Sequence, residues 1–196
     1  YASRQGKQKA LIVHARTPSE DAGRTALQQA LVNNGVSASV EGYEFSQEAI
    51  VAAARRISNR VNVDGTDVVL LTADYPGGLP FLAQLLPEAG VDPAVVQYGG
   101  LARWDAQPSA FNLPAIQGGW FAIPNEAKYS AFRNRYQAAY GSAPHALASI
   151  AFDGVAAIAA SVAEGGRQPL SGVGLTRARG FEGASGIFRL QSNGRV

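Results

Sequence analysis

The sequence predicts an α/β fold with a doubly wound and mostly parallel sheet. Short apolar runs alternate with longer amphipathic segments over the first 123 residues, as in parallel strands joined by crossover helices. Residues 68–71 are apolar without alternation, which is typical of a strand covered on both faces. Residues 36–43 alternate at period two, which indicates an edge strand with one buried face.

The remaining elements follow in chain order. Thr17, Pro18 and Glu20 form a capping box, with an N-cap hydroxyl, a proline in the first turn and a glutamate at the third position, so a helix begins there. The residues from 99 to 117 have no clear period and predict a long loop, a kind of segment that is often functional. We expect strands at 10–13, 36–43, 68–71, 95–98, 118–123 and 186–190, and helices at 18–33, 46–63, 77–86, 126–140 and 145–164.

Composition excludes several classes of protein. With 46% hydrophobic and 16% charged residues the chain is not disordered, and a net charge of +2 is too small for a nucleic-acid binder. There is no cysteine, and the two histidines, His14 and His145, are far apart, so we expect no structural metal. No run of about 18 apolar residues predicts a membrane span. The chain also lacks methionine, and we expect it to be a processed or partial form of a longer polypeptide.

No motif for catalysis or for a cofactor is complete. The phosphate-binding loop and the dinucleotide fingerprint are absent, and Gly183-Ala184-Ser185-Gly186 is one residue short of a nucleophile elbow. We therefore expect neither an enzyme nor a cofactor. A small α/β enzyme remains the alternative, because the same sheet serves many chemistries.

A candidate ligand site lies at the ends of two predicted strands. With the strand order 2-1-3-4-5, ligands bind at the carboxyl ends of the first and third strands, here residues 14–18 and 72–78. The candidate residues are Arg16 and Thr17 at the first end, and Asp74 and Tyr75 at the second. Asp74 could pair with an ammonium group and Tyr75 could stack on an apolar ligand. Alternatively, Asp74 caps the third helix and Tyr75 covers its start.

The long loop adds two candidates, Arg103 and Trp104. The tryptophan could form the wall of a cleft or the anchor of a partner interface. Alternatively, its ring covers the end of the sheet, which is also how we interpret Trp120.

Several motifs in the second half resemble a known family. They are Phe132-x3-Tyr136-x3-Tyr140-Gly141-x2-Pro144, Ala151-Phe152-Asp153-Gly154-Val155, and Phe181-Glu182-Gly183-x2-Gly186-Ile187-Phe188. Their order and spacing resemble the distal half of type I periplasmic binding proteins of the Leu/Ile/Val-binding kind. Residues 85–93, the Trp104-Asp105 pair and residues 118–121 are similar to the branch of penicillin-binding-protein activator lipoproteins.

The resemblance implies a two-lobed, exported protein with a ligand cleft between the lobes. Residues 1–123 would form the second lobe, residues 124–180 would be helices crossing to the first lobe, and residues 181–196 would return to the second. The protein would be a periplasmic solute receptor or a regulator of a cell-wall synthase, lipid-anchored in the activator branch. Its partner would be a small solute such as an amino acid, or a penicillin-binding protein. The alternative function is that of a substrate-binding protein of a branched-chain amino-acid ABC transporter. Asp74 is the nearest counterpart of the acidic side chain that binds the ligand ammonium in amino-acid receptors.

Overall fold

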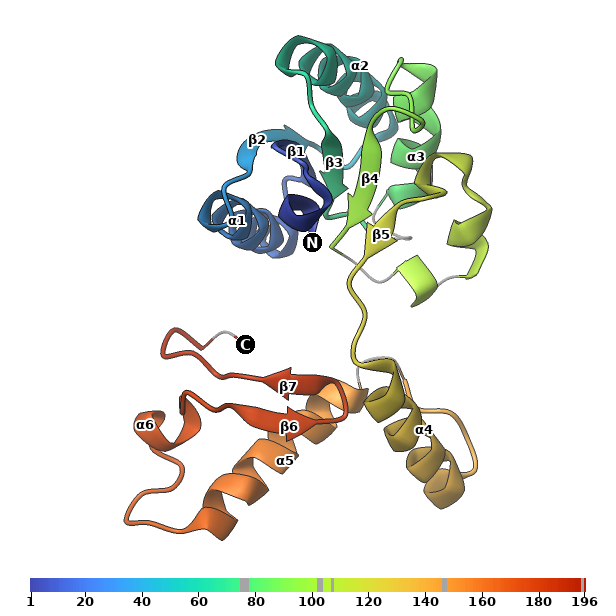
Figure 1. The fold of residues 1–196 in the computed structure, drawn as a ribbon. Helices are drawn as coiled ribbons and strands as arrows, with labels where there is room; N and C mark the ends of the chain where they lie inside the picture. The colour runs from blue at the N-terminus through green and yellow to red at the C-terminus, as the bar shows by residue number, and fades with distance from the viewer. Residues whose placement is uncertain (75–77, 102–103, 107, 146–147, 195) are drawn as a thin grey trace. The chain divides into compact units, whose positions relative to one another are not determined.

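The computed structural model describes residues 1–74, 78–101, 104–106, 108–145, 148–194 and 196. The chain divides into two compact units, residues 1–122 and 123–196 (Figure 1). The boundary lies just ahead of Pro124, where the chain leaves the sheet.

The first unit contains a five-stranded parallel sheet with the order β2-β1-β3-β4-β5, so the predicted fold class and strand order are confirmed (Figure 1). The edge position of β2 and the buried interior position of β3 also agree with the sequence patterns. The strands are β1 (Lys9–Ala15), β2 (Ser37–Tyr43), β3 (Val68–Leu71), β4 (Gln97–Gly100) and β5 (Trp120–Phe121).

Helices cover both faces of this sheet. Alternate residues of β1 and β3 point to opposite faces, and each set belongs to a different cluster of buried apolar side chains. Ile12 and Leu70 pack on the side of α1 (Pro18–Asn33), while Val13 and Leu71 pack on the side of α2 (Gln47–Asp64) and α3 (Leu79–Glu88). Short 3-10 turns occupy Ala2–Gln5, Trp104–Ala106, Pro108–Asn112 and Pro114–Ile116.

The fourth and fifth strands differ from their predicted bounds. Strand β4 begins at Gln97, because the N–H groups of Val95 and Val96 donate to the carbonyl of Asp92 and close a turn there. Strand β5 has only Trp120 and Phe121, which pair with Gly99 and Gly100. These two glycines therefore belong to the sheet and not to the loop that we expected from residue 99.

The described residues of the second unit form three helices and a hairpin. Helices α4 (Glu126–Tyr140), α5 (Ala148–Glu164) and α6 (Gly172–Leu175) precede the antiparallel strands β6 (Phe181–Gly183) and β7 (Gly186–Phe188). The hairpin belongs to the second unit, where β6 packs against α5.

A buried carboxylate attaches the hairpin to α5. Asp153 accepts hydrogen bonds from the N–H groups of Ala184 and Ser185, the latter at 2.9 Å, and its side chain is buried. An acidic side chain within an apolar helix is thus satisfied by two hydrogen bonds. Gly183 permits the close approach, since a Cβ at this position would overlap the Asp153 carboxylate.

Candidate functional site

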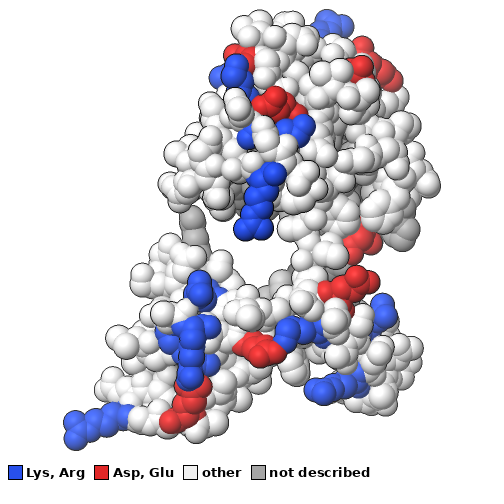
Figure 2. Space-filling view, viewed as in Figure 1, with Lys and Arg blue, Asp and Glu red and all other residues white. Residues whose placement is uncertain are grey.

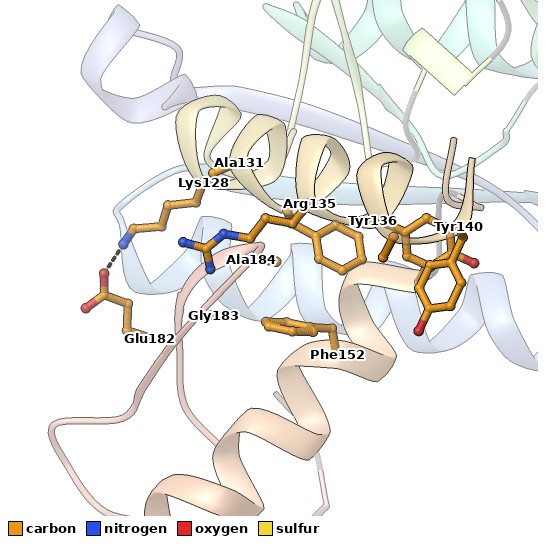
Figure 3. A pocket seen from close by; sticks show the side chains of 12 residues that line it. Lys128, Ala131, Arg135, Tyr136, Tyr140, Phe152, Glu182, Gly183 and Ala184 are labelled. Atoms are coloured by element: carbon orange, nitrogen blue, oxygen red, sulfur yellow. Dashed lines mark hydrogen bonds and ion pairs between the residues drawn. The ribbon is translucent and has the colours of Figure 1, made fainter. Parts of the chain in front are cut away.

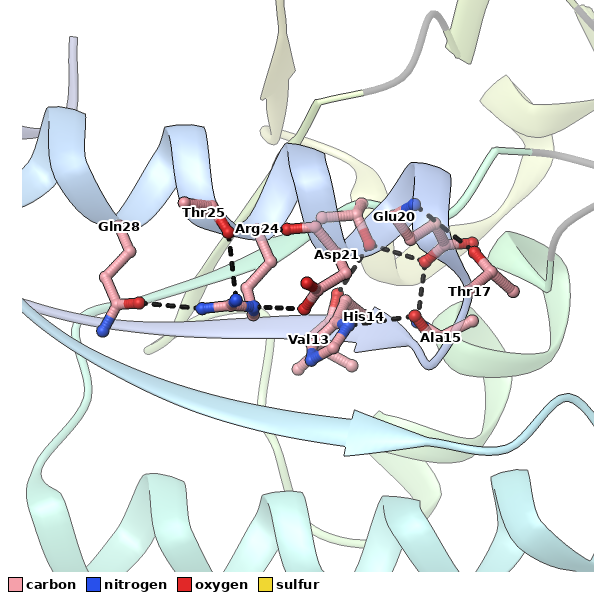
Figure 4. Close-up of polar contacts among 10 residues, drawn as sticks. Val13, His14, Ala15, Thr17, Glu20, Asp21, Arg24, Thr25 and Gln28 are labelled. Atoms are coloured by element: carbon pink, nitrogen blue, oxygen red, sulfur yellow. Dashed lines mark hydrogen bonds and ion pairs between the residues drawn. The ribbon is translucent and has the colours of Figure 1, made fainter.

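The carboxyl ends of β1 and β3 are tied together by Glu20, in the first turn of α1 (Figure 4). One carboxylate oxygen, Oε2, accepts from the backbone N–H of Ala15 at 2.7 Å and from the hydroxyl of Thr72 at 2.6 Å. The Thr72 hydroxyl also lies 3.3 Å from the carbonyl oxygen of Val13. A single side chain thus joins α1 to both strands at the point where the crossovers diverge.

Glu20 does not complete the predicted capping box. The Thr17 hydroxyl accepts from the Glu20 N–H at 3.3 Å, so the N-cap half of the motif is confirmed. The reciprocal bond is absent, because the Thr17 N–H donates to the Ala15 carbonyl at 2.9 Å and the Glu20 carboxylate is engaged by Ala15 and Thr72.

The same face of α1 carries a second polar network (Figure 4). The Arg24 guanidinium donates to Asp21 at 2.7 Å, to Gln28 at 3.0 Å and to Thr25 at 3.0 Å. The hydrogen bond from Arg24 holds the pKa of Asp21 below its usual range. The Arg24 guanidinium therefore makes its hydrogen bonds within its own helix and is less available to a ligand than an unpaired guanidinium.

Burial and two carboxylates act together on Tyr43, the last residue of β2. Burial raises the pKa of Tyr43, and the charges of Glu20 and Asp74 raise it further. The phenol consequently keeps its proton. The sequence patterns did not single out Glu20, Tyr43 or Thr72 as site residues, although all three lie at the predicted edge.

The candidate residues Arg16, Thr17 and Asp74 lie at that edge, as expected. Arg16 is exposed and its guanidinium is 3.6 Å from the Glu44 carboxylate, while Thr17 is the N-cap of α1. Asp74 is exposed directly after β3, and its carbonyl accepts from the N–H of Leu79 at 3.0 Å. The N-cap of α3 is Gly78, whose φ of 109° favours glycine, so Asp74 is not the N-cap residue. The candidates Tyr75 and Arg103 lie outside the described residues.

Trp104 corrects an expectation. Its side chain is only 2% exposed and packs within the core, with its ring 5.5 Å from that of Phe121. The indole N–H is buried and has no acceptor among the described residues. Trp104 therefore covers the end of the sheet, which was the alternative interpretation, and it does not form an exposed anchor for a partner.

A groove of about 640 Å³ lies within the second unit, between α4, α5 and β6 (Figure 3). Aromatic side chains from both helices line it, and Phe132 packs against Phe152 with ring centroids 5.1 Å apart. At one end Lys128 forms an ion pair with Glu182, which lowers the pKa of that carboxyl. These aromatic residues occur in the motifs of the sequence analysis, but the motifs did not predict a cavity.

Charged side chains of both signs are interspersed on the face shown in Figure 2. The described residues include ion pairs such as Arg56–Glu41 and Arg177–Glu164. Within the described residues no cluster of three or more histidine, aspartate or glutamate side chains could hold a metal ion. No helix formed by those residues is long and apolar enough to cross a membrane.

Comparison with known proteins identifies the family. The model of the family described as "periplasmic binding protein" matches residues 1–195, so the chain belongs to this family. No curated protein matches the sequence.

Solved structures share the fold at low sequence identity. A putative branched-chain amino acid ABC transporter protein from Rhodospirillum rubrum is 18% identical, with a TM-score of 0.74, over 98% of this chain and 56% of the other. An ABC transporter substrate-binding protein from Desulfitobacterium hafniense, in complex with Leu, is 16% identical, with a TM-score of 0.62, over 99% and 56%. A leucine-binding protein from Thermotoga maritima is 16% identical, with a TM-score of 0.63, over 98% and 56%. This chain thus spans little more than half the length of the structures that it matches.

The comparisons support the family more firmly than any branch within it. The Desulfitobacterium hafniense structure is described as an ABC transporter substrate-binding protein and the Rhodospirillum rubrum structure as a branched-chain amino acid ABC transporter. Both descriptions agree with the transporter alternative of the sequence analysis. None of the comparisons described above points to the penicillin-binding-protein activator branch or to a lipid anchor.

Proposed function

We propose that the chain is part of a non-catalytic, periplasmic solute-binding protein of an ABC transporter, with an amino acid as its solute. Family membership and the substrate-binding neighbours support the class. The observation that carries the choice of site is the carboxyl edge of the first unit, where exposed Asp74 and Arg16 lie at the ends of β3 and β1.

The chemistry of this edge suits a zwitterion. The Asp74 carboxylate can pair with an ammonium group, and the Arg16 guanidinium can bind a carboxylate through two N–H donors. Glu20 ties Ala15 to Thr72 and so keeps the ends of β1 and β3 in register beneath the ligand. Thr17, Tyr75 and Arg103 remain candidates for further contacts.

A lobe that binds a solute becomes a receptor only when the ligand favours one conformation. Contacts from two lobes make the closed state more stable than the open state. A ligand with equal affinity for both states does not shift the equilibrium between them. The proposed receptor function is therefore a function of the native-length protein.

The test is calorimetric titration of the native-length protein with each of the twenty amino acids and with 4-hydroxybenzoate, the ligand of a Rhodopseudomonas palustris neighbour. We expect at least one amino acid to bind, and Asp74→Asn to weaken it about 10- to 100-fold, since hydrogen bonds to charged groups contribute about 1.5–3 kcal/mol. Glu88→Gln, which removes an exposed carboxylate at the other end of α3, is the matched control and should bind normally.

Two outcomes would contradict the proposal. Absence of binding by every amino acid would remove amino acids as the solute class. Equal affinities of the Asp74→Asn and Glu88→Gln variants would remove Asp74 from the site. The activator alternative is not favoured, because Trp104, its expected anchor, is buried.

A further inference from the structure

Arginine side chains gather at one end of the second unit, around the turn between α6 and β6. Over residues 165–194 the sequence contains four arginines, and its one acidic residue, Glu182, is paired with Lys128. Figure 2 shows basic side chains on the second unit near the hairpin, with an acidic side chain beside them. This segment therefore carries an excess of positive charge that its own sequence does not neutralise.

Two of these arginines share a single carboxylate at the C-terminus of α5. Arg177 and Arg179 both donate to the same oxygen, Oε2, of Glu164, the last residue of α5. A shared acceptor atom brings the two guanidinium groups next to each other, although like charges repel. Glu164 supplies one negative charge and the end of the helix about half a charge more, so the pair is not fully neutralised.

Backbone carbonyls hold two of the arginines at the same turn. The Nε of Arg177 donates to the carbonyl of Gly180 at 2.9 Å, and its Cζ lies 3.9 Å from the centroid of the Phe181 ring. The Nε of Arg189 donates to the carbonyl of Ala178 at 2.5 Å. A third guanidinium group, that of Arg189, is thus fixed where two like charges already lie.

Gly180 allows this close arrangement. Its φ is 67°, in the left-handed region that favours glycine. A Cβ at this position would lie 2.3 Å from the carbonyl oxygen of Phe188 and 2.8 Å from Cγ of Arg189. The end of β7 and the stem of Arg189 therefore approach the turn more closely than a side chain at position 180 would permit.

The cluster keeps donors that its internal contacts do not use. A guanidinium group has about five N–H donors, and the contacts of Arg177, Arg179 and Arg189 use one or two each. In the part of the chain that the structure describes, no acceptor is found for the two Nη groups of Arg189. The Arg179 side chain is 67% exposed, so a ligand can reach the cluster from solvent.

We propose that Arg177, Arg179 and Arg189 form a binding site for a phosphate group on the second unit. Guanidinium forks match phosphate oxygens through pairs of hydrogen bonds. A phosphate group offers more oxygens and more negative charge than a carboxylate, which suits three guanidinium groups that share one carboxylate. The group can belong to inorganic phosphate or to an anionic lipid headgroup. The site uses no residue of the carboxyl edge of the first unit.

Two binding assays on the native-length protein test the inference and distinguish the sources. Calorimetric titration with inorganic phosphate, at low ionic strength to limit screening, measures binding of the free anion. Co-sedimentation with phosphatidylcholine vesicles, with and without phosphatidylglycerol, measures binding of the lipid headgroup. Arg179→Gln and Arg189→Gln each remove one guanidinium group from the site. Arg133→Gln, which removes an exposed arginine from α4 of the same unit, is the matched control.

We expect saturable binding in at least one assay, weakened about 10-fold by either site variant and changed less than about twofold by the control. Binding of phosphate alone assigns the free anion, and sedimentation only with phosphatidylglycerol assigns the lipid headgroup. Binding in neither assay would overturn the inference. Equal losses in the site variants and in Arg133→Gln would also overturn it, since they would show only a general attraction by positive charge.

The two site variants guard against a folding defect. Arg189→Gln removes the donor to the Ala178 carbonyl, whereas the exposed Arg179 contacts Glu164 and can be replaced with less disturbance. Circular dichroism of each variant checks the fold, and Arg179→Gln alone is sufficient to decide. None of these outcomes depends on solute binding to the first unit.

Discussion

At the scale of single residues, the Glu20 carboxylate accepts hydrogen bonds from two residues outside its own helix. It satisfies the N–H of Ala15, a residue that is almost fully buried, and also accepts from Thr72. A buried N–H group that loses its acceptor costs about 1–3 kcal/mol. The stability of the carboxyl edge therefore depends on this one side chain.

The variant Glu20→Ala should lower the free energy of unfolding by about 1–3 kcal/mol, because the Ala15 N–H loses its acceptor. Urea denaturation measures the change. Glu48→Ala is the matched control, since Glu48 is also an acidic residue in a first helical turn and its removal tests the helix dipole alone. Equal losses in the two variants would show that the tie from Glu20 to β1 and β3 contributes nothing.

Asp67 makes a comparable tie at the opposite, amino end of the strands. Its Oδ2 atom accepts from the N–H groups of Gln8 and Lys9, each at 2.8 Å. The hydrogen bond from Gln8, with that from Lys9, holds the pKa of Asp67 below its usual value of 3.8. Because the folded pKa is lower than the unfolded one, the stabilisation is full above the unfolded pKa and is lost as the pH falls through the folded pKa.

The variant Asp67→Asn should therefore be less stable than the parent above about pH 5, and the difference should shrink as the pH falls below about 4. The amide oxygen of asparagine can still accept hydrogen bonds, so the comparison isolates the charge. Urea midpoints between pH 2 and pH 7 measure the effect. A difference that stays constant across this range would show that Asp67 does not act through its charge.

At the scale of elements, two glycines explain why β4 was placed incorrectly. The sequence pattern assigned Gly99 and Gly100 to a loop, because glycine in the interior of a strand weakens the strand. In the structure both pair with β5, and they leave room for rings on either face, since a Cβ on Gly99 would overlap Trp120 and one on Gly100 would overlap Trp104. Close packing of an aromatic ring on a strand is not visible in a period-two pattern.

The variant Gly100→Ala should consequently lower the free energy of unfolding by about 1–3 kcal/mol through overpacking against Trp104. A double-mutant cycle with Trp104→Phe tests the cause, because the smaller ring makes room for the new methyl group. We expect the double variant to lose less stability than the sum of the single variants. Additive losses would show that the two side chains do not share this space.

At the scale of the whole molecule, local patterns predicted the order of elements better than their ends. The apolar run Val68–Leu71 and the alternation of residues 36–43 were sufficient for the central and edge positions. The contact between Glu20 and Thr72 spans 52 positions and has no local signal. The packing of β6 on α5 depends likewise on bonds from Ala184 and Ser185 to Asp153, 31 and 32 residues away. The sequence thus predicted the order of the strands whose ends carry the candidate residues, but not the side chains that join those ends.

The two units differ in what they contain, and this difference predicts how the chain behaves when it is divided. All five strands of the parallel sheet and both clusters of buried apolar residues lie within residues 1–122. A fragment of residues 1–122 should therefore fold alone and unfold cooperatively in urea, with a free energy of roughly 5–15 kcal/mol. A fragment of residues 123–196 should show no cooperative transition, because the large apolar side chains of α5, such as Ile150 and Val155, stay exposed.

Circular dichroism during urea titration measures both fragments. A gradual, non-cooperative change in the first fragment would show that its sheet depends on the rest of the chain, and a cooperative change in the second would show that the exposed apolar side chains of α5 are tolerated.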